Sequence, residues 1–198
     1  SGNAGLLVST LKAFQDYQQE KAWNWEHQAL VRARVVAGCP QLAERFNAVR
    51  EGILSAPRDE AKLKQEVVEM RQKMLSHLST YKELELNPHR LGADFTFNLK
   101  QDPGGIVDIE FLAQYLVLRW SGEKPPVAQW TDNMRILDSA LEQGVMSPDD
   151  VSALQSAYLL YRSQTHALAL LNGGTSVSAD LFINERRQVR EIRRKSFS

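Results

Sequence analysis

Cysteine, excess charge of either sign and long apolar runs are all scarce in this 198-residue sequence. A single cysteine excludes an internal disulfide framework and is typical of a reducing cytoplasm. No apolar run reaches the roughly 18 residues that a membrane-spanning helix needs, and the first residues lack the basic and apolar regions of a secretory signal. The 24 basic residues are balanced by 24 acidic ones, which argues against a dedicated nucleic-acid-binding domain. The sequence therefore predicts a cytoplasmic globular protein with no membrane and no nucleic-acid partner.

Several motifs of catalysis are also absent. The sequence has no glycine-rich phosphate-binding loop ending in lysine, no Gly-x-Gly-x-x-Gly and no His-Glu-x-x-His. The 4 histidines are scattered, with no pair at the spacing of metal ligands, so a histidine-based metal site is not expected. Cys39 stands between a glycine and a proline, and no activating base is identifiable. We interpret it as a small residue at a helix boundary.

Helical periodicity is what the sequence has in abundance. Apolar residues recur every three or four positions, and the breaks fall at glycine, proline and capping residues. Strand-like patterns are confined to residues 6–8 and 95–99. The sequence predicts an all-α helical bundle with small strand pieces, in which residues 79–105 form a long irregular connection. Helices are expected at 11–37, 41–54, 59–78, 106–120, 131–143, 147–171 and from 178 onward.

The densest polar cluster lies within residues 23–34, where two tryptophans accompany a carboxylate, an imidazole and two guanidiniums. On a helix, Gln28 and Arg32 share one face, while Glu26 and Arg34 lie roughly 100° further round. Two interpretations stay open. The tryptophans belong to the core and the charges pair on the helix surface, or the cluster serves a functional site.

A second cluster begins at Lys100 and leads into the apolar run 106–120. Gly104 and Gly105 precede a predicted helix, where free backbone N–H groups and the helix dipole favour an anion. Lys100 could supply the positive charge. A plain turn beside a surface lysine is the alternative interpretation.

Asp108 and Glu110 imitate the paired carboxylates of a nucleotidyltransferase metal site, which must project from one side of a strand. The run 106–120 is too long and too rich in leucine for a strand, so it predicts a buried helix. On that helix the two side chains point about 200° apart. They are therefore expected to pair with arginines and to bind no metal. The basic face of the last helix, with four arginines at helical spacing, is interpreted as solvated or paired with acids rather than as a phosphate site.

Five stretches of the sequence resemble one protein family, the bifunctional glutamine synthetase adenylyltransferase and adenylyl-removing enzymes. The longest are AWNWEHQALVRARVV at 22–36 and GGIVDIEFLAQYL at 104–116. The shorter ones are GLLVS at 5–9, MRQKM at 70–74 and WTDNMRIL at 130–137. The resemblance implies an enzyme with two similar halves, each a nucleotidyltransferase core followed by a helical domain. One half attaches AMP to glutamine synthetase, using ATP and magnesium, and the other removes it.

The resemblance also implies that this chain is the end of the adenylyltransferase half. Residues 1–10 are then a strand stump of the core, and 11–198 are the helical domain. The family's catalytic carboxylates would precede Ser1, so the chain by itself is expected to contain no catalytic residue and no metal ligand, to bind no cofactor tightly and to transfer no AMP. The implied partners are the upstream core, glutamine synthetase and a PII-type signal protein. A non-catalytic interaction module is the alternative.

Two groups of site residues follow from these arguments. The candidates for the nucleotide or phosphate side are Lys100, Gly104, Gly105, Arg32 and Arg34. The candidates for a structural polar network are Glu26, His27, Gln28, Asp108 and Glu110.

Overall fold

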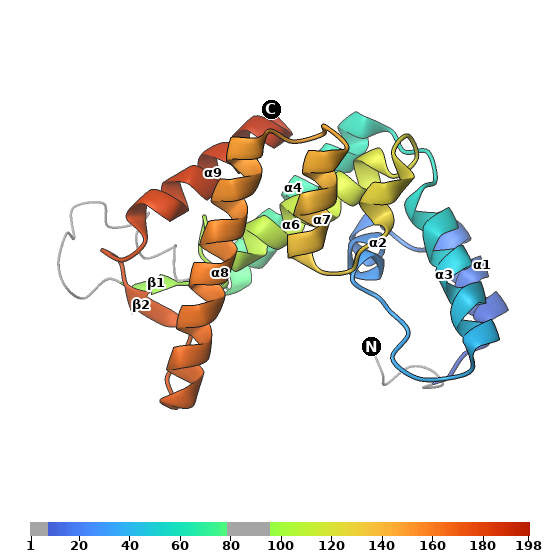
Figure 1. Cartoon of the computed structure of the whole chain (residues 1–198), viewed down its shortest axis with the longest axis horizontal. Helices are drawn as coiled ribbons and strands as arrows, with labels where there is room; N and C mark the ends of the chain where they lie inside the picture. Colours follow the sequence, from blue (N-terminus) through green and yellow to red (C-terminus); the bar gives the residue numbers. More distant parts are fainter. Residues whose placement is uncertain (1–7, 79–95) are drawn as a thin grey trace.

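The computed structural model describes residues 8–78 and 96–198. It is an all-α bundle accompanied by one small two-stranded sheet, as the sequence predicts (Figure 1). The helices are α1 (Leu11–Glu20), α2 (Asn24–Val31), α3 (Pro40–Leu54), α4 (Glu60–Leu78), α6 (Ile106–Trp120), α7 (Asn133–Glu142), α8 (Pro148–Leu170) and α9 (Ile183–Phe197), with a short 3-10 helix η1 (Pro125–Ala128). The strands are β1 (Thr96–Asn98) and β2 (Ser176–Ser178).

Helix α6 is the centre of the bundle. It contacts α2, α4, α7, α8 and α9, and it runs through the middle of the molecule in Figure 1. Its apolar side chains face every neighbour, so residues such as Ile109, Leu112 and Val117 are fully buried. The predicted buried helix at 106–120 is confirmed, and it is the framework on which the polar clusters are arranged.

The prediction of one helix over residues 11–37 is wrong. The chain breaks between α1 and α2, where Trp23 adopts extended dihedrals and its backbone N–H donates to Glu26 Oε2 at 2.9 Å, a capping contact that starts a new helix. Helix α2 ends at Val31, where Arg50 donates to the carbonyls of Leu30 and Val31 from outside the helix. Residues 33–39 are therefore irregular.

The other predicted helix starts agree with the structure within a few residues. Asp59 Oδ1 accepts from the N–H of Lys62 at 2.7 Å at the start of α4, and Ser147 caps α8 with Pro148 at its first position. The last helix is the exception, because it begins at Ile183 rather than at 178. The predicted start at residue 178 is instead the end of β2, a strand that the sequence did not predict.

The sheet joins two segments that are far apart in the sequence. Phe97 of β1 pairs in antiparallel register with Val177 of β2, and the Phe97 ring is fully buried against Tyr161 of α8. The predicted strand at 95–99 is confirmed for residues 96–98, and residue 95 lies outside the described residues. Most of the predicted strand at 6–8 lies outside them too, and Val8 is in no strand.

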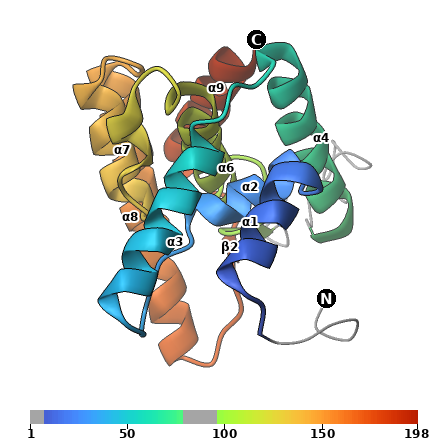
Figure 2. The same cartoon turned by 90° about the vertical axis from the view of Figure 1, so that its right-hand side faces the viewer.

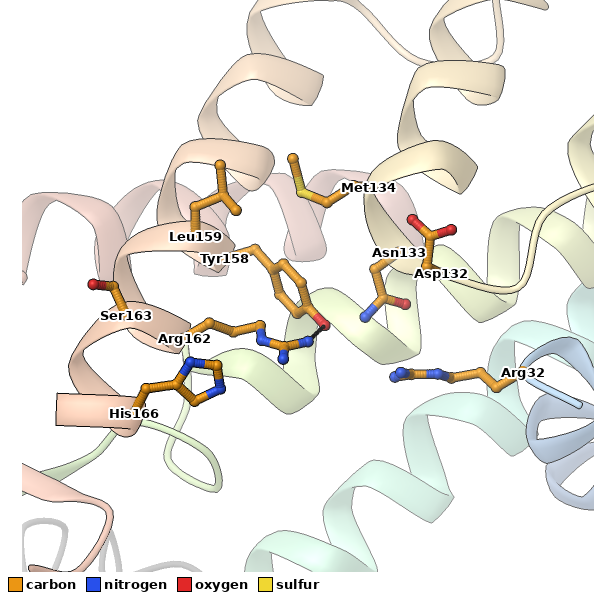
Figure 3. Close-up of a pocket in the computed structure, with 9 residues that line it drawn as sticks. All are labelled: Arg32, Asp132, Asn133, Met134, Tyr158, Leu159, Arg162, Ser163 and His166. Atoms are coloured by element: carbon orange, nitrogen blue, oxygen red, sulfur yellow. Dashed lines mark hydrogen bonds between the residues drawn. The ribbon is translucent and has the colours of Figure 1, made fainter. Parts of the chain in front are cut away.

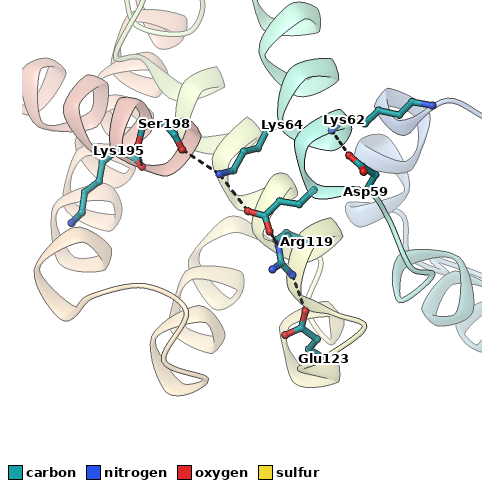
Figure 4. A network of polar contacts seen from close by, with 8 residues as sticks. Asp59, Lys62, Lys64, Arg119, Glu123, Lys195 and Ser198 are labelled. Atoms are coloured by element: carbon teal, nitrogen blue, oxygen red, sulfur yellow. Dashed lines mark hydrogen bonds and ion pairs between the residues drawn. The ribbon is translucent and has the colours of Figure 1, made fainter.

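Two peripheral features complete the shape. Helices α1 and α3 lie against each other at one end of the molecule, as both views show (Figures 1 and 2). At another edge, an ion network joins α4, α6 and the end of α9 (Figure 4). In that network Glu60 lies 2.8 Å from Arg119 and 3.3 Å from Lys64, which in turn donates to the backbone carbonyl of Ser198. These contacts join the end of α9 to α4 and α6.

Candidate functional site

The turn before α6 is held together by the side chains of Asn98 and Asp102, which accept from backbone N–H groups. Asn98 Oδ1 accepts from the N–H groups of Lys100 and Gln101, both at 3.0 Å. Asp102 Oδ2 accepts from the N–H of Asn98 at 2.8 Å. Lys100 is exposed at the outside of this turn. The turn therefore presents a lysine from a rigid backbone.

The two glycines of this turn have their N–H groups occupied within the chain. The N–H of Gly104 donates to Asp108 Oδ2 at 2.7 Å, and that of Gly105 donates to the carbonyl of Asp102 at 2.9 Å. The anion at this helix start is thus the carboxylate of Asp108 itself. Glycine is required for packing, since a Cβ on Gly104 would lie 2.6 Å from the carbonyl oxygen of Arg186.

Asp108 sits between two guanidiniums. Its Oδ1 accepts from Arg71 Nε at 2.6 Å and lies 3.6 Å from Arg193 Nε. Arg71 is fully buried, and its Nη2 also donates to the carbonyl of Gln101 at 2.8 Å. The aspartate thereby ties α4 and α9 to the start of α6.

Glu110 faces another side of α6. Its Oε1 lies 2.6 Å from Arg32 Nη1, just after α2, and 3.5 Å from Asn133 Nδ2 at the start of α7. Asp108 and Glu110 both pair with arginines, as the sequence predicts, and they project toward different elements. Among the described residues, no three side chains of His, Cys, Asp or Glu gather closely enough to hold a metal ion.

The polar residues of α2 make contacts inside the chain. Glu26 accepts from the Tyr17 hydroxyl at 2.7 Å, and Gln28 donates to Gln114 of α6 at 3.2 Å. The Nε2 atom of His27 donates to the carbonyl of Gln18 at 2.9 Å, which leaves Nδ1 to accept from Arg58 at 3.3 Å. Burial is the main cause that lowers the pKa of His27. These contacts join α1, α2 and α6.

Two arginines that the sequence analysis overlooked are bound mainly by carbonyl groups. Arg50 donates to Leu30 and Val31 and, at 2.8 Å, to Ala128. Arg58 donates to the last carbonyls of α3, and burial lowers its pKa to about 10. Neither has a recognisable motif, because carbonyl partners leave no trace in side-chain spacing.

A cavity of about 440 Å³, here called the arginine pocket, opens between the end of α2, the start of α7 and one face of α8 (Figure 3). Its α8 face carries Tyr158, Arg162 and His166, one helical turn apart. This spacing is a signal that the sequence analysis missed. The pocket is lined by Arg32, Asp132, Asn133, Met134, Tyr158, Leu159, Arg162, Ser163 and His166.

A second cavity of about 390 Å³, here called the N-terminal pocket, lies between α1, α3 and the irregular segment 33–39. Its walls include Phe14, Phe46 and the half-exposed Leu42, with Arg34 at its edge. Trp23 and Trp25, also in this part of the chain, are exposed by 66% and 49%. The structure thus divides the predicted cationic candidates among three places. Lys100 lies on the turn, Arg32 in the arginine pocket and Arg34 in the N-terminal pocket.

No helix in the described ranges is long and apolar enough to cross a membrane.

Comparison with known proteins gives consistent matches over the whole chain. Residues 1–49 match the family model of glutamate-ammonia ligase adenylyltransferase, and residues 64–192 match that of GlnD PII-uridylyltransferase. A bifunctional glutamine synthetase adenylyltransferase/adenylyl-removing enzyme of Hahella chejuensis is 48% identical over 198 residues, which are 100% of this chain and 20% of the relative. Proteins of the same name from Pseudomonas aeruginosa and Acinetobacter baylyi are 50% and 51% identical over 98% and 90% of this chain, covering 20% and 19% of their own lengths. The chain spans about a fifth of the length of these curated relatives.

Proposed function

The chain belongs to the family of bifunctional glutamine synthetase adenylyltransferase/adenylyl-removing enzymes, and its residues 64–192 belong to the domain family of GlnD PII-uridylyltransferase. From this premise we propose that it is the helical domain, at 11–198, of an enzyme that transfers AMP from ATP to a tyrosine of glutamine synthetase. The observation that carries the proposal is the near-50% identity along the whole chain to relatives that bear this name.

In this proposal ATP and magnesium bind mainly to the nucleotidyltransferase core, in the part of the enzyme beyond this chain. The reaction is an in-line displacement that depends on positioning and charge neutralisation. The pairing of Asp108 with Arg71 and of Glu110 with Arg32 supports structural roles for these two carboxylates. Glu26, His27 and Gln28 join the same structural network through their contacts with α1 and α6.

Lys100 is the cation that we place at the edge of the nucleotide site. It is exposed on a turn whose backbone is fixed by Asn98 and Asp102, so its ammonium group can reach outward from a rigid base. Gly104 allows α9 to approach closely, and Gly105 allows the close approach of the Leu99 and Asp102 carbonyls within the turn. Their own N–H groups are engaged within the chain. Arg32 and Arg34 would contact ligands or partners in their separate pockets.

The interaction module remains the second candidate, and the N-terminal pocket favours it. An apolar cavity whose wall includes the half-exposed Leu42 is typical of a surface that a partner covers. The upstream core is the partner that we assign to this surface. Glutamine synthetase and a PII-type protein are the further partners of the enzyme, the latter supported by the family name GlnD PII-uridylyltransferase. The exposed free thiol of Cys39 fits a cytoplasmic location.

The Lys100→Ala variant of the full-length enzyme tests the proposal. We expect the KM for ATP to rise several-fold, because one charge at the edge of the nucleotide site is lost, while the melting temperature stays within about 1 °C since Lys100 is exposed. Lys73→Ala, an exposed lysine on α4, is the matched control. Unchanged kinetics for both ATP and glutamine synthetase in Lys100→Ala would show that the turn is only a connector, and the interaction module would then be the better description.

A further inference from the structure

One buried polar atom in the arginine pocket has no partner. The side chain of Asn133 is 1% exposed, and its Oδ1 has no hydrogen-bond donor in the described chain. The amide orientation is determined by Glu110, whose carboxylate can only accept and therefore faces the Nδ2 atom. A buried acceptor left without a donor is costly. A bound molecule that offers an N–H or O–H group at this point would remove that cost.

The same pocket carries positive charge that the protein does not neutralise. Arg162 is exposed and contacts Tyr158, whose hydroxyl lies 3.4 Å from Nη1 and whose ring lies beneath the guanidinium. No carboxylate of the described residues pairs with Arg162. In Figure 3 the guanidinium groups of Arg162 and Arg32 point toward each other from opposite walls, and His166 lies beside Arg162. The pocket therefore attracts an anion.

The negative groups near the pocket are already engaged. Asp132 caps α7 by accepting from the N–H of Arg135 at 3.0 Å, and it also pairs with the guanidinium of that arginine. Glu110 holds one N–H of Arg32, and a guanidinium has five N–H donors, so Arg32 keeps others for a ligand. The start of α7, which also lines the pocket, adds the positive end of a helix dipole.

We propose that the arginine pocket binds a small phosphomonoester of about the size of a nucleoside monophosphate. Arg162, Arg32, His166 and the Ser163 hydroxyl offer more donors than the two oxygens of a carboxylate can use, whereas the three terminal oxygens of a phosphate can accept from all of them. A volume of about 440 Å³ exceeds a lone phosphate and suits a larger molecule. A hydroxyl or amino group of that molecule donates to Asn133 Oδ1. This inference does not depend on the proposed function.

Calorimetric titration of the 198-residue chain with AMP and with adenosine tests the charge requirement. We expect saturable binding of AMP, at least tenfold tighter than adenosine. Arg162→Gln should weaken AMP binding at least tenfold and leave the melting temperature nearly unchanged, because Arg162 is exposed. Arg187→Gln, the same charge change at an exposed position of α9, should bind AMP like the parent chain. Equal affinity for adenosine and AMP, or equal loss in the two variants, would overturn the proposal.

A second measurement locates the ligand within the pocket. On addition of AMP, the imidazole NMR signals of His166 should shift, whereas those of His77 on α4 should not. Asn133→Leu removes the unpaired acceptor with a side chain of similar size, so AMP binding should weaken while inorganic phosphate binding stays the same. If the His77 and His166 signals shift alike, or if Asn133→Leu weakens phosphate and AMP equally, the site is elsewhere or lacks the donor contact, and the inference fails.

Discussion

At the scale of single residues, the best-defined feature is the buried carboxylate of Asp108. It neutralises the fully buried Arg71 at 2.6 Å and accepts from the N–H of Gly104. A buried ion pair is weak evidence for net stability, but removing one partner leaves an uncompensated charge in the core. The pair between Glu110 and Arg32 has the same length and is more exposed. The two pairs therefore allow the contribution of a buried ion pair to stability to be compared with that of a more exposed one.

Asp108→Asn should lower the free energy of unfolding by about 3–5 kcal/mol, because Arg71 would stay buried without a carboxylate. Glu110→Gln should cost about 1 kcal/mol or less, since solvent reaches both members of its pair. Urea denaturation of the 198-residue chain measures both. A magnesium-dependent rise in melting temperature that disappears in Asp108→Asn would contradict the structural role and point to a metal ligand.

His27 makes the stability of the folded chain depend on pH. Burial lowers its pKa in the folded chain below the ordinary value of about 6.5. Between the two pKa values the unfolded chain binds more protons, so stability rises with pH in this window and is lost as the pH falls below about 6.5. Protonation would also place an N–H at Nδ1, which faces the guanidinium of Arg58.

We therefore expect the parent chain to lose more stability than His27→Gln when the pH is lowered from about 7.5 to about 5. Urea denaturation at both pH values gives the difference. His77→Gln, which changes an exposed histidine of α4, should follow the parent chain. Parallel pH profiles for the parent and His27→Gln would show that His27 does not titrate in the folding equilibrium.

At the scale of elements, the turn before α6 decides how closely α9 can approach. Gly104 has a φ of +87°, which L side chains rarely adopt, and its Cα faces the backbone of Arg186. Gly144 has a φ of +66°, but the space around it is open. Substitutions at both glycines meet conformational strain, but only a substitution at Gly104 also meets a close neighbour.

Gly104→Ala should destabilise the chain by about 2–4 kcal/mol, because strain adds to the overlap of the new Cβ with the carbonyl of Arg186. Gly144→Ala should cost about 1 kcal/mol, from strain alone. Thermal unfolding followed by circular dichroism compares them. Equal costs at both positions would mean that α9 can move away without penalty.

At the scale of the whole molecule, the N-terminal pocket is the surface that we assign to the upstream core. The chain by itself should transfer no AMP to glutamine synthetase, and mixing it with the separately purified core should restore transfer. Leu42→Asp, at a position 48% exposed on this surface, should lower the restored activity at least tenfold without changing the melting temperature. Leu170→Asp, at a position 87% exposed on α8, is the control. Equal restoration by the two variants would place the contact with the core elsewhere.

The sequence by itself determined the helical class, the buried helix at 106–120, most helix boundaries and the family. These properties depend on local periodicity, on capping residues such as Asp59 and Ser147, and on long motifs, all of which are written in consecutive positions. The sequence also placed Asp108 and Glu110 on different faces of one helix, because helical geometry alone separates them.

Only the tertiary structure decided which groups meet. At the end of α2, Arg50 reaches across from α3 and binds carbonyls that no sequence pattern marks. The occupancy of the N–H groups at Gly104 and Gly105 depends on the way the turn folds back onto Asp108 and Asp102. The arginine pocket brings Arg32 and Arg162 together from segments 130 positions apart. These long-range contacts result from packing around α6, and no local sequence pattern predicts them.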